Sequence, residues 1–365
     1  ISNLNAIGND YNLIRTTIEN AADQMWNLAS TPAAAQDDRW AYWARLHMRV
    51  AIRNHPYLKT QRARRFRMLT ELQDRSRGIS SIDFSAANPG DKKILLIAFD
   101  PFGLDSAVHE DYNIKKSSPG AAAAMSLHGQ PLSQGGFNGY VQAVVLPVRY
   151  RVFQRDDLET IVLPLLTGAD KIDMICTLHD NRNGRYDIER FASRKRGVDH
   201  TDNDNKQGGA LAARYYRARP DASMTPPFKL VRYAERTRPK FLTPTLPIAN
   251  MIPGTLGNNL VIYNQQYATD NPADTQALSA AGSGTANVPS PNNASNPTVG
   301  SSGDFLFNEA FYKIASIRQD VASTTKTGHI SLERIQGPSD DFDLPATQNV
   351  QANLASLIRD ALAGL

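Results

Sequence analysis

Apolar residues recur at helical spacing throughout the first 90 residues of the chain. Three stretches, 12–29 (NLIRTTIENAADQMWNLA), 37–52 (DDRWAYWARLHMRVAI) and 58–78, follow this pattern and predict three helices. Trp40 and Trp43 are three positions apart and share one helix face, so we expect that face to be buried. Residues 1–90 are therefore predicted to be a helical N-terminal extension that packs on the rest of the chain.

From residue 93 the pattern changes to short apolar runs that alternate with helical stretches. The runs KILLIAF (93–99), VQAVVLPV (141–148) and KIDMICTL (171–178) are typical of buried central strands. Residues 155–168 predict a crossover helix and residues 349–365 an amphipathic final helix. This alternation predicts a three-layer α/β/α domain with a mainly parallel sheet over residues 91–365. Residues 268–303 are small and polar, and predict a surface insertion rich in Gly, Ser, Asn and Pro.

Composition narrows the possible partners. The net charge of +4 is too small to indicate nucleic-acid binding, and no apolar run is long enough to span a membrane. The single cysteine, Cys176, excludes an internal disulfide and a cysteine-rich metal site. The loop DNRNG (180–184) has its glycine one position too early for a calcium loop. We therefore expect no metal and no cofactor.

Two further features concern the surface. The cluster Arg62, Arg64, Arg65 and Arg67 could meet phosphates or acidic lipids, but it is better explained as a solvated helix face. On that interpretation Phe66, Met68, Leu69 and Leu72 pack inward. The sequon at Asn293 favours a secreted or extracytoplasmic location over a cytoplasmic one.

The turn FDPFG (99–103) places two aromatic residues where the first predicted strand ends. Phe99 and Phe102 could simply close the end of the sheet. Alternatively they could line a small apolar pocket for a flat ring. Ligands of parallel sheets bind at the carboxyl ends of the strands, which is where this turn lies.

Several motifs in this order resemble the pyroglutamyl peptidase I (pyrrolidone carboxyl peptidase) family. FDPFG is similar to the family's N-terminal signature, VLPV (145–148) to its second strand, and YDIERFA (186–192) to the segment of its catalytic glutamate. Asp202-Asn203 follows at the expected distance. The resemblance covers residues 93–365. It implies that Phe99 and Phe102 bind the ring of a small peptide or pyroglutamyl-like ligand, and that Glu189 is the catalytic glutamate.

The chain differs from the family at positions that correspond to the family's catalytic residues. The family's nucleophilic cysteine falls on Gly257 or Asn258 in PGTLGNNLVIY (253–263), and Cys176 lies in the middle of a strand. His329, in KTGHISL, matches the family's later histidine. The family's active-site arginine falls on Asp199, and Arg194 or Arg196 could approximate it.

Two functions follow from this combination. One is a pyroglutamyl-peptidase-like protein that has lost cysteine peptidase activity and acts as a binding or structural module. The alternative is an active amide-bond hydrolase that uses Glu189 and His329 without a cysteine. Binding of nucleic acid or a membrane through Arg62–Arg67 has only charge in its favour.

Overall fold

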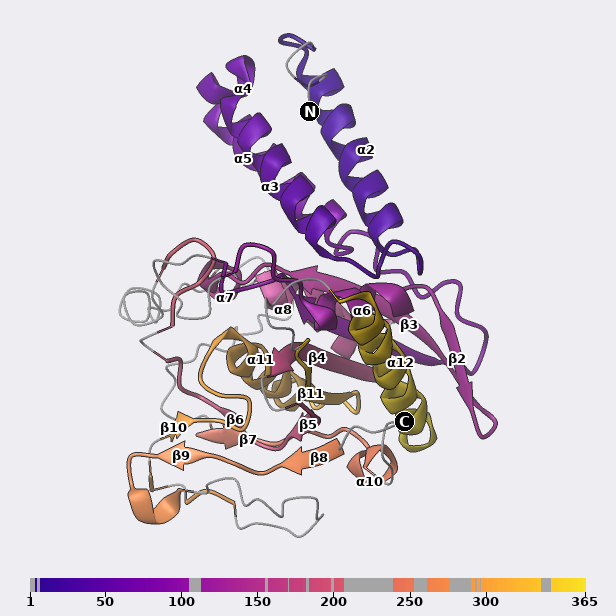
Figure 1. The fold of residues 1–365 in the computed structure, drawn as a ribbon, viewed down its shortest axis with the longest axis vertical. Coiled ribbons are helices and arrows are strands. Elements are labelled where there is room, and N and C mark those ends of the chain that lie inside the picture. The colour runs from indigo at the N-terminus through magenta and orange to yellow at the C-terminus, as the bar shows by residue number, and fades with distance from the viewer. Residues whose placement is uncertain are drawn as a thin grey trace.

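The fold consists of a helical arm that stands on an α/β body (Figure 1). The computed structural model describes residues 4, 7–104, 113–154, 157–169, 171–181, 184–197, 200–206, 239–252, 261–275, 290–292, 294–295, 297–335 and 343–365. No helix within these ranges is long and apolar enough to cross a membrane.

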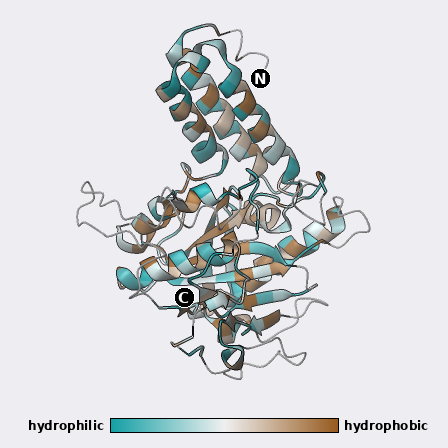
Figure 2. Cartoon of the chain, turned by 90° about the vertical axis from the view of Figure 1, so that its left-hand side faces the viewer, coloured by the Kyte–Doolittle hydropathy of each residue, from teal (hydrophilic) through white to brown (hydrophobic). Residues whose placement is uncertain are grey.

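The arm comprises α2 (Tyr11–Ala29), α3 (Arg39–Asn54), α4 (Pro56–Thr60) and α5 (Arg62–Ser76). Asp10 begins α2 by accepting hydrogen bonds from the backbone N–H groups of Asn12 and Leu13, which have no partner within the helix. Each arm helix carries both apolar and polar residues along its length (Figure 2). The apolar sides meet in a core of their own, which includes Ile14, Ile18, Ile52, Met68 and Leu72. The sequence prediction of helices in this region is therefore confirmed.

The base of the arm is anchored by a tryptophan other than the two expected. Trp26 is 1% exposed and belongs to the core cluster of the body, and its indole N–H donates to Nε2 of His128 at 3.3 Å. Trp40, in contrast, is 37% exposed, and Trp43 is half-buried. The expected burial of the Trp40 face is wrong because α3 turns Ala41, Tyr42 and Arg45 inward instead.

The α5 helix corrects a second expectation. Met68 and Leu72 are buried and Leu69 is half-buried, as predicted, but Phe66 is 49% exposed. Phe66 therefore lies on the arginine-rich side of the helix and leaves an aromatic ring at the surface.

A seven-stranded sheet forms the centre of the body, with strand order β2-β3-β1-β4-β11-β5-β8. The pairs β1–β3, β1–β4, β4–β11 and β5–β8 are parallel, whereas β2–β3 and β11–β5 are antiparallel. The strands are β1 (Lys92–Phe99), β2 (Pro131–Gln134), β3 (Phe137–Leu146), β4 (Met174–Asn181), β5 (Tyr186–Glu189), β8 (Val261–Asn264) and β11 (Lys326–Glu333).

Helices cover both faces of this sheet. One face packs against α6 (Pro119–Leu127) and α12 (Leu344–Ala361), and the other against α8 (Asp157–Thr167) and α11 (Leu306–Asp320). Successive residues of a strand point to opposite faces, so Cys176 and Leu178 of β4 face α6 and α12, while Ile175 faces α8 and α11. The predicted three-layer α/β/α domain with a mainly parallel sheet, preceded by helices, is confirmed.

The strand order reverses at β1. From β1 the chain passes through α6 to β3 on one side, and from β3 through α8 to β4 on the other side of β1. Open α/β sheets place ligand sites at the carboxyl ends of the strands where such a reversal occurs. The ends of β1 and β4 are therefore the part of the body in which a site is expected.

Short elements complete the described body. Residues 268–303 were predicted to be a surface insertion, and their described ends pair as the two-stranded sheet β10–β9. The elements are α7 (Tyr150–Gln154), β6 (Ala192–Ser193), β7 (Phe241–Leu242), α10 (Ile248–Met251), β9 (Ala268–Thr269), η1 (Pro272–Asp274), β10 (Pro297–Val299) and η2 (Leu362–Gly364).

Candidate functional site

The aromatic turn lies at the carboxyl end of β1, with its two rings in different surroundings. Phe99 is 2% exposed, and its ring meets the edge of Phe307 from α11 at 4.9 Å between centroids. Phe102 is half-buried and lies 5.3 Å from Phe307 and 6.2 Å from Phe305. Phe99 is thus a core residue and Phe102 is the more accessible ring. Their predicted role in ring binding stays a prediction.

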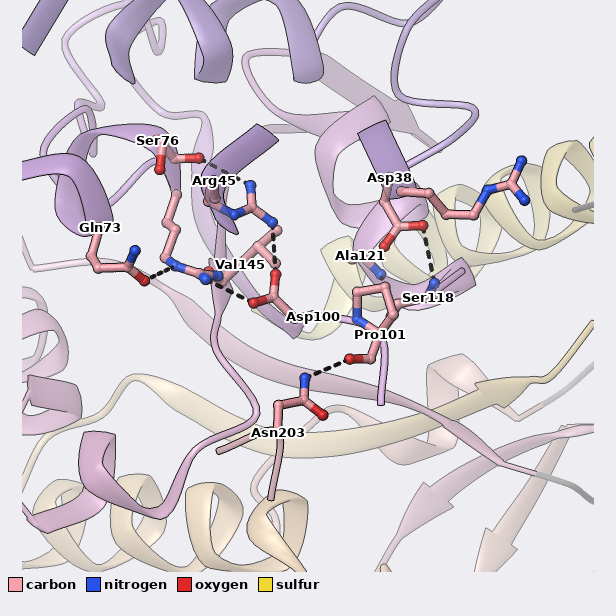
Figure 3. Close-up of polar contacts among 12 residues, drawn as sticks. Asp38, Arg45, Gln73, Ser76, Asp100, Pro101, Ser118, Ala121, Val145 and Asn203 are labelled. Carbon is pink, nitrogen blue, oxygen red and sulfur yellow. Dashed lines mark hydrogen bonds and ion pairs between the residues drawn. The ribbon is translucent and has the colours of Figure 1, made fainter. Parts of the chain in front are cut away.

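Asp100 of the same turn holds the arm to the body (Figure 3). Its carboxylate accepts a hydrogen bond from Arg45 of α3 at 2.7 Å and another from Arg77 at 2.7 Å. Arg77 also donates to the carbonyl of Val145 and to Gln73. All three charged side chains are 2–3% exposed. Burial lowers the pKa of Arg45 to about 10, and the Asp100 carboxylate opposes that decrease.

Two carboxyl groups, buried Asp38 and half-buried Asp180, lie at the start of α6. Asp38 of the arm accepts a hydrogen bond from the backbone N–H of Ser118 at 3.0 Å (Figure 3). Asp180 accepts one from the backbone N–H of Gly120 at 2.8 Å. Burial raises the pKa of Asp180 to about 6 and raises that of Asp38 well above its usual value. These carboxyl groups satisfy backbone donors that α6 leaves without partners within the helix.

Glu189 ends β5 and lies in a buried polar cluster on the α11 face of the sheet. One carboxyl oxygen accepts from the hydroxyl of Ser331, and the other accepts from Nδ2 of Asn264 at 2.8 Å. Burial raises the pKa of Glu189 well above its usual value, and nearby Asp187 raises it further, against the effect of the two hydrogen bonds. The side chain is therefore fixed from two neighbouring strands, β11 and β8.

His329 lies in the same cluster and connects to a histidine that the sequence analysis did not single out. Nε2 of His329 is 2.6 Å from Nδ1 of His179, and Nδ1 of His329 is 2.6 Å from the hydroxyl of Thr177. The rings stack at 4.8 Å between centroids, and His179 also stacks on Phe307 at 4.5 Å. Burial lowers the pKa of His179 to about 3 and that of His329 well below its usual value. Both rings are neutral at neutral pH.

One arrangement of hydrogens satisfies the chain of contacts. His179 donates from Nδ1 to His329, His329 donates from Nδ1 to Thr177, and the Thr177 hydroxyl donates to the carbonyl of Gly328 at 3.2 Å. The hydroxyl of Ser331, 3.2 Å from Nδ1 of His179, joins this chain to Glu189. Glu189 and His329 thus lie in one network, and their catalytic roles stay predictions.

The only cysteine of the chain lies on the other side of the sheet. Cys176 is completely buried and packs in the cluster formed with α6 and α12. Its neighbour Thr177 points to the opposite face and contacts His329. Burial also raises the pKa of the Cys176 thiol. A buried thiol of raised pKa is a poor nucleophile, and this one has no access to either histidine.

The other residues named from the sequence differ in how they are placed. Arg196 forms a bidentate ion pair with Glu309 of α11, in which Nε donates to Oε2 at 2.6 Å. Its guanidinium also lies over the ring of Tyr150. Asn203 donates to the carbonyl of Pro101 at 2.8 Å and so fixes the aromatic turn (Figure 3). Gly257, Asn258 and Asp199 lie outside the described residues. In the part of the chain that the structure describes, no group of three or more His, Cys, Asp or Glu side chains could hold a metal ion.

Comparison with known sequences finds similarity in the first part of the body. The family model described as the PA0049 C-terminal domain matches residues 93–228. The chain is 26% identical over 188 residues to "Uncharacterized protein PA0049" of Pseudomonas aeruginosa. This match covers 48% of the chain and 34% of that relative, so it spans about a third of the relative's length.

The solved structures that resemble the chain include pyroglutamyl peptidases from three organisms. Pyroglutamyl peptidase I of Bacillus amyloliquefaciens has a TM-score of 0.44 at 14% identity, covering 75% of this chain and 94% of the other. A mutant pyrrolidone carboxyl peptidase of Pyrococcus furiosus has a TM-score of 0.45 at 17% identity, covering 74% and 98%. The enzyme of Thermococcus litoralis has a TM-score of 0.42 at 16% identity, covering 74% and 94%.

Proposed function

We propose that this chain is a pyroglutamyl-peptidase-like binding module that does not use cysteine peptidase chemistry. The main evidence is the position of Cys176. This residue is buried on the face of the sheet that α6 and α12 cover, whereas Glu189 and His329 lie on the face that α11 covers. Thiolate attack requires a histidine within hydrogen-bond reach of the sulfur. Neighbouring strand residues point to opposite faces, so no change of rotamer can bring Cys176 to His329.

The state of the histidines supports the same proposal. A general base works best when its pKa lies near the working pH. Burial lowers the pKa of His179 to about 3 and that of His329 well below its usual value. Both nitrogens of His329 are already engaged by Thr177 and His179. The network therefore acts as a polar core that fixes β4, β11, β5 and β8 relative to one another.

Alkylation of Cys176 tests whether this thiol is buried away from the histidines. In the folded protein we expect iodoacetamide to modify Cys176 only as fast as the protein unfolds, because the thiol is fully buried. In denaturant the same thiol should react completely. Cys176 is the only thiol, so mass spectrometry gives a single unambiguous signal, with Cys176→Ala as the blank. Labelling of the native protein at the rate of a free cysteine would contradict the proposal.

The second candidate function is an amide-bond hydrolase without a cysteine. The observation that favours it is the continuous contact from Glu189 through Ser331 and His179 to His329. In the arrangement above, Nε2 of His179 keeps a lone pair that could accept a proton from water. The low pKa of His179 makes it a weak base at neutral pH, which is why we place this function second.

A further inference from the structure

A groove at the junction of arm and body is lined by arginines. It lies between α3 and α5 on one side and the end of β3 with α7 and α8 on the other, and has a volume of about 610 Å³. Cavities of this size at the boundary between two structural units are typical ligand sites. We call it the arginine groove, and the charged residues that define it are Arg49, Arg53, Arg77, Arg149 and Arg151.

Three of these five arginines form no ion pair with any residue that the structure describes. Arg77 is paired with Asp100, and Nε of Arg149 lies 3.1 Å from Asp204. Arg49, Arg53 and Arg151 form no hydrogen bond or ion pair with any residue in the described ranges. Three guanidinium groups on different sides of one groove are therefore free to bind an anionic ligand.

One buried donor in the groove also lacks an acceptor. Nε2 of Gln73 is shielded from solvent and has no hydrogen-bond partner in the described part of the chain. The other end of the Gln73 amide accepts from Arg77, which fixes its orientation (Figure 3). Buried donors without acceptors cost stability, and a ligand that supplies oxygen atoms removes that cost.

Part of the remaining wall is apolar. Phe66, 49% exposed, Leu69 and Ile161 line the groove, and Phe66 and Leu69 continue into a neighbouring hollow that adds Arg62 and Arg65. A compact inorganic anion would leave this wall uncovered. Asp74 and Asp157 also line the groove, so a continuous run of phosphates would meet repulsion there. The surface suits separate carboxylates on either side of an apolar side chain.

We propose that the arginine groove binds an acidic peptide segment that carries an aromatic residue between glutamates or aspartates. The carboxylates meet Arg49, Arg53 and Arg151 and the amide donor of Gln73, and the aromatic ring packs on Phe66. The proposal rests on the binding role proposed above, for which it supplies the location and the chemistry of the partner.

Fluorescence anisotropy with a labelled Glu-Glu-Phe-Glu-Glu peptide tests this site on the full chain. We expect saturable binding that weakens about tenfold or more in the Arg49→Gln, Arg53→Gln double variant, because each lost contact is a charge-assisted hydrogen bond. Arg67→Gln is the matched control, since Arg67 is exposed on α5 and does not line the groove. Phe66→Ala should weaken binding of this peptide but not of Glu-Glu-Ala-Glu-Glu. Circular dichroism checks that each variant remains folded.

Several results would overturn the proposal. These are no binding of the peptide by the native protein, equal binding by the double variant, or tighter binding of a thymidine oligonucleotide of equal charge. A Lys-Lys-Phe-Lys-Lys peptide should not bind, and its binding would also count against the site. None of these results depends on peptidase activity. Thiol-sensitive turnover of a pyroglutamyl substrate would instead refute the proposed function and leave the groove result standing.

Discussion

Replacing Asp100 by asparagine should lower the free energy of unfolding by about 3–5 kcal/mol. Asp100 is the shared partner of Arg45 and Arg77, and all three side chains are 2–3% exposed. Asparagine has nearly the same shape but no charge, so two buried guanidinium groups would be left without a counter-ion. Removing one partner of a buried ion pair leaves an uncompensated charge in the interior, so it costs far more than breaking a surface ion pair, which is worth about 0–1 kcal/mol. Chemical denaturation measures the change.

The control for this variant is Asp83→Asn. Asp83 is exposed and, among the described residues, accepts hydrogen bonds only from nearby Ser85, so we expect a change below about 0.5 kcal/mol. Limited proteolysis should also release the arm more readily from the Asp100→Asn protein than from the control. A stability loss in Asp100→Asn no larger than that of the control would show that Asp100 does not hold the arm to the body.

Replacing Trp26 by alanine should cost about 3–5 kcal/mol, because a large buried side chain leaves a cavity that its surroundings fill only in part. Trp26 is 1% exposed in the core cluster of the body. Gly78 presses against the same ring: a Cβ atom at that position would lie 2.3 Å from Trp26. Glycine has no Cβ and therefore permits this close approach, and it also tolerates the left-handed backbone at position 78, where φ is 79°.

Trp40→Ala is the matched comparison, because it removes the same side chain from a site that is 37% exposed. We expect less than about 1 kcal/mol for Trp40, measured by the same denaturation experiment. If Trp40→Ala proved as destabilising as Trp26→Ala, the arm would be docked through the Trp40 face of α3, as the sequence suggests, and the arrangement at Trp26 would be wrong.

The central strands and their helices could be predicted from the sequence because their signals are local. KILLIAF and KIDMICTL are apolar runs of strand length, and they became β1 and β4. The docking face of the arm could not be predicted in the same way. Helical periodicity identifies an apolar side but does not say which neighbour covers it, and Trp26 and Trp40 both fit the pattern.

The polar network could be predicted only in part. The motif resemblance predicts Glu189 and His329, whereas His179 directly follows an apolar run and matches no motif. The alternation of polar and apolar residues gives a signal for this network. Polar residues stand two positions apart in the apolar parts of both strands: Thr177 and His179 on β4, and His329 and Ser331 on β11. The antiparallel pairing of β11 with β5, which brings Glu189 to Ser331 across 142 positions of sequence, has no local signature.

The role of Asp100 could not be predicted from the aromatic turn alone. The motif FDPFG suggests a role for its two phenylalanines, whereas the aspartate between them forms two buried ion pairs with the arm. Its partners, Arg45 and Arg77, lie 55 and 23 positions away in the helical extension, which the family resemblance does not cover.

Turnover of a pyroglutamyl arylamide tests the central claim most directly. The native protein and the Glu189→Gln variant would be assayed with and without iodoacetamide, beside an active pyroglutamyl peptidase as the positive control. The proposed binding module predicts release of arylamine no faster than in a heat-denatured sample, for both proteins and regardless of alkylation. Turnover by the native protein that disappears in Glu189→Gln, while the melting temperature stays unchanged, would contradict this account and establish the hydrolase.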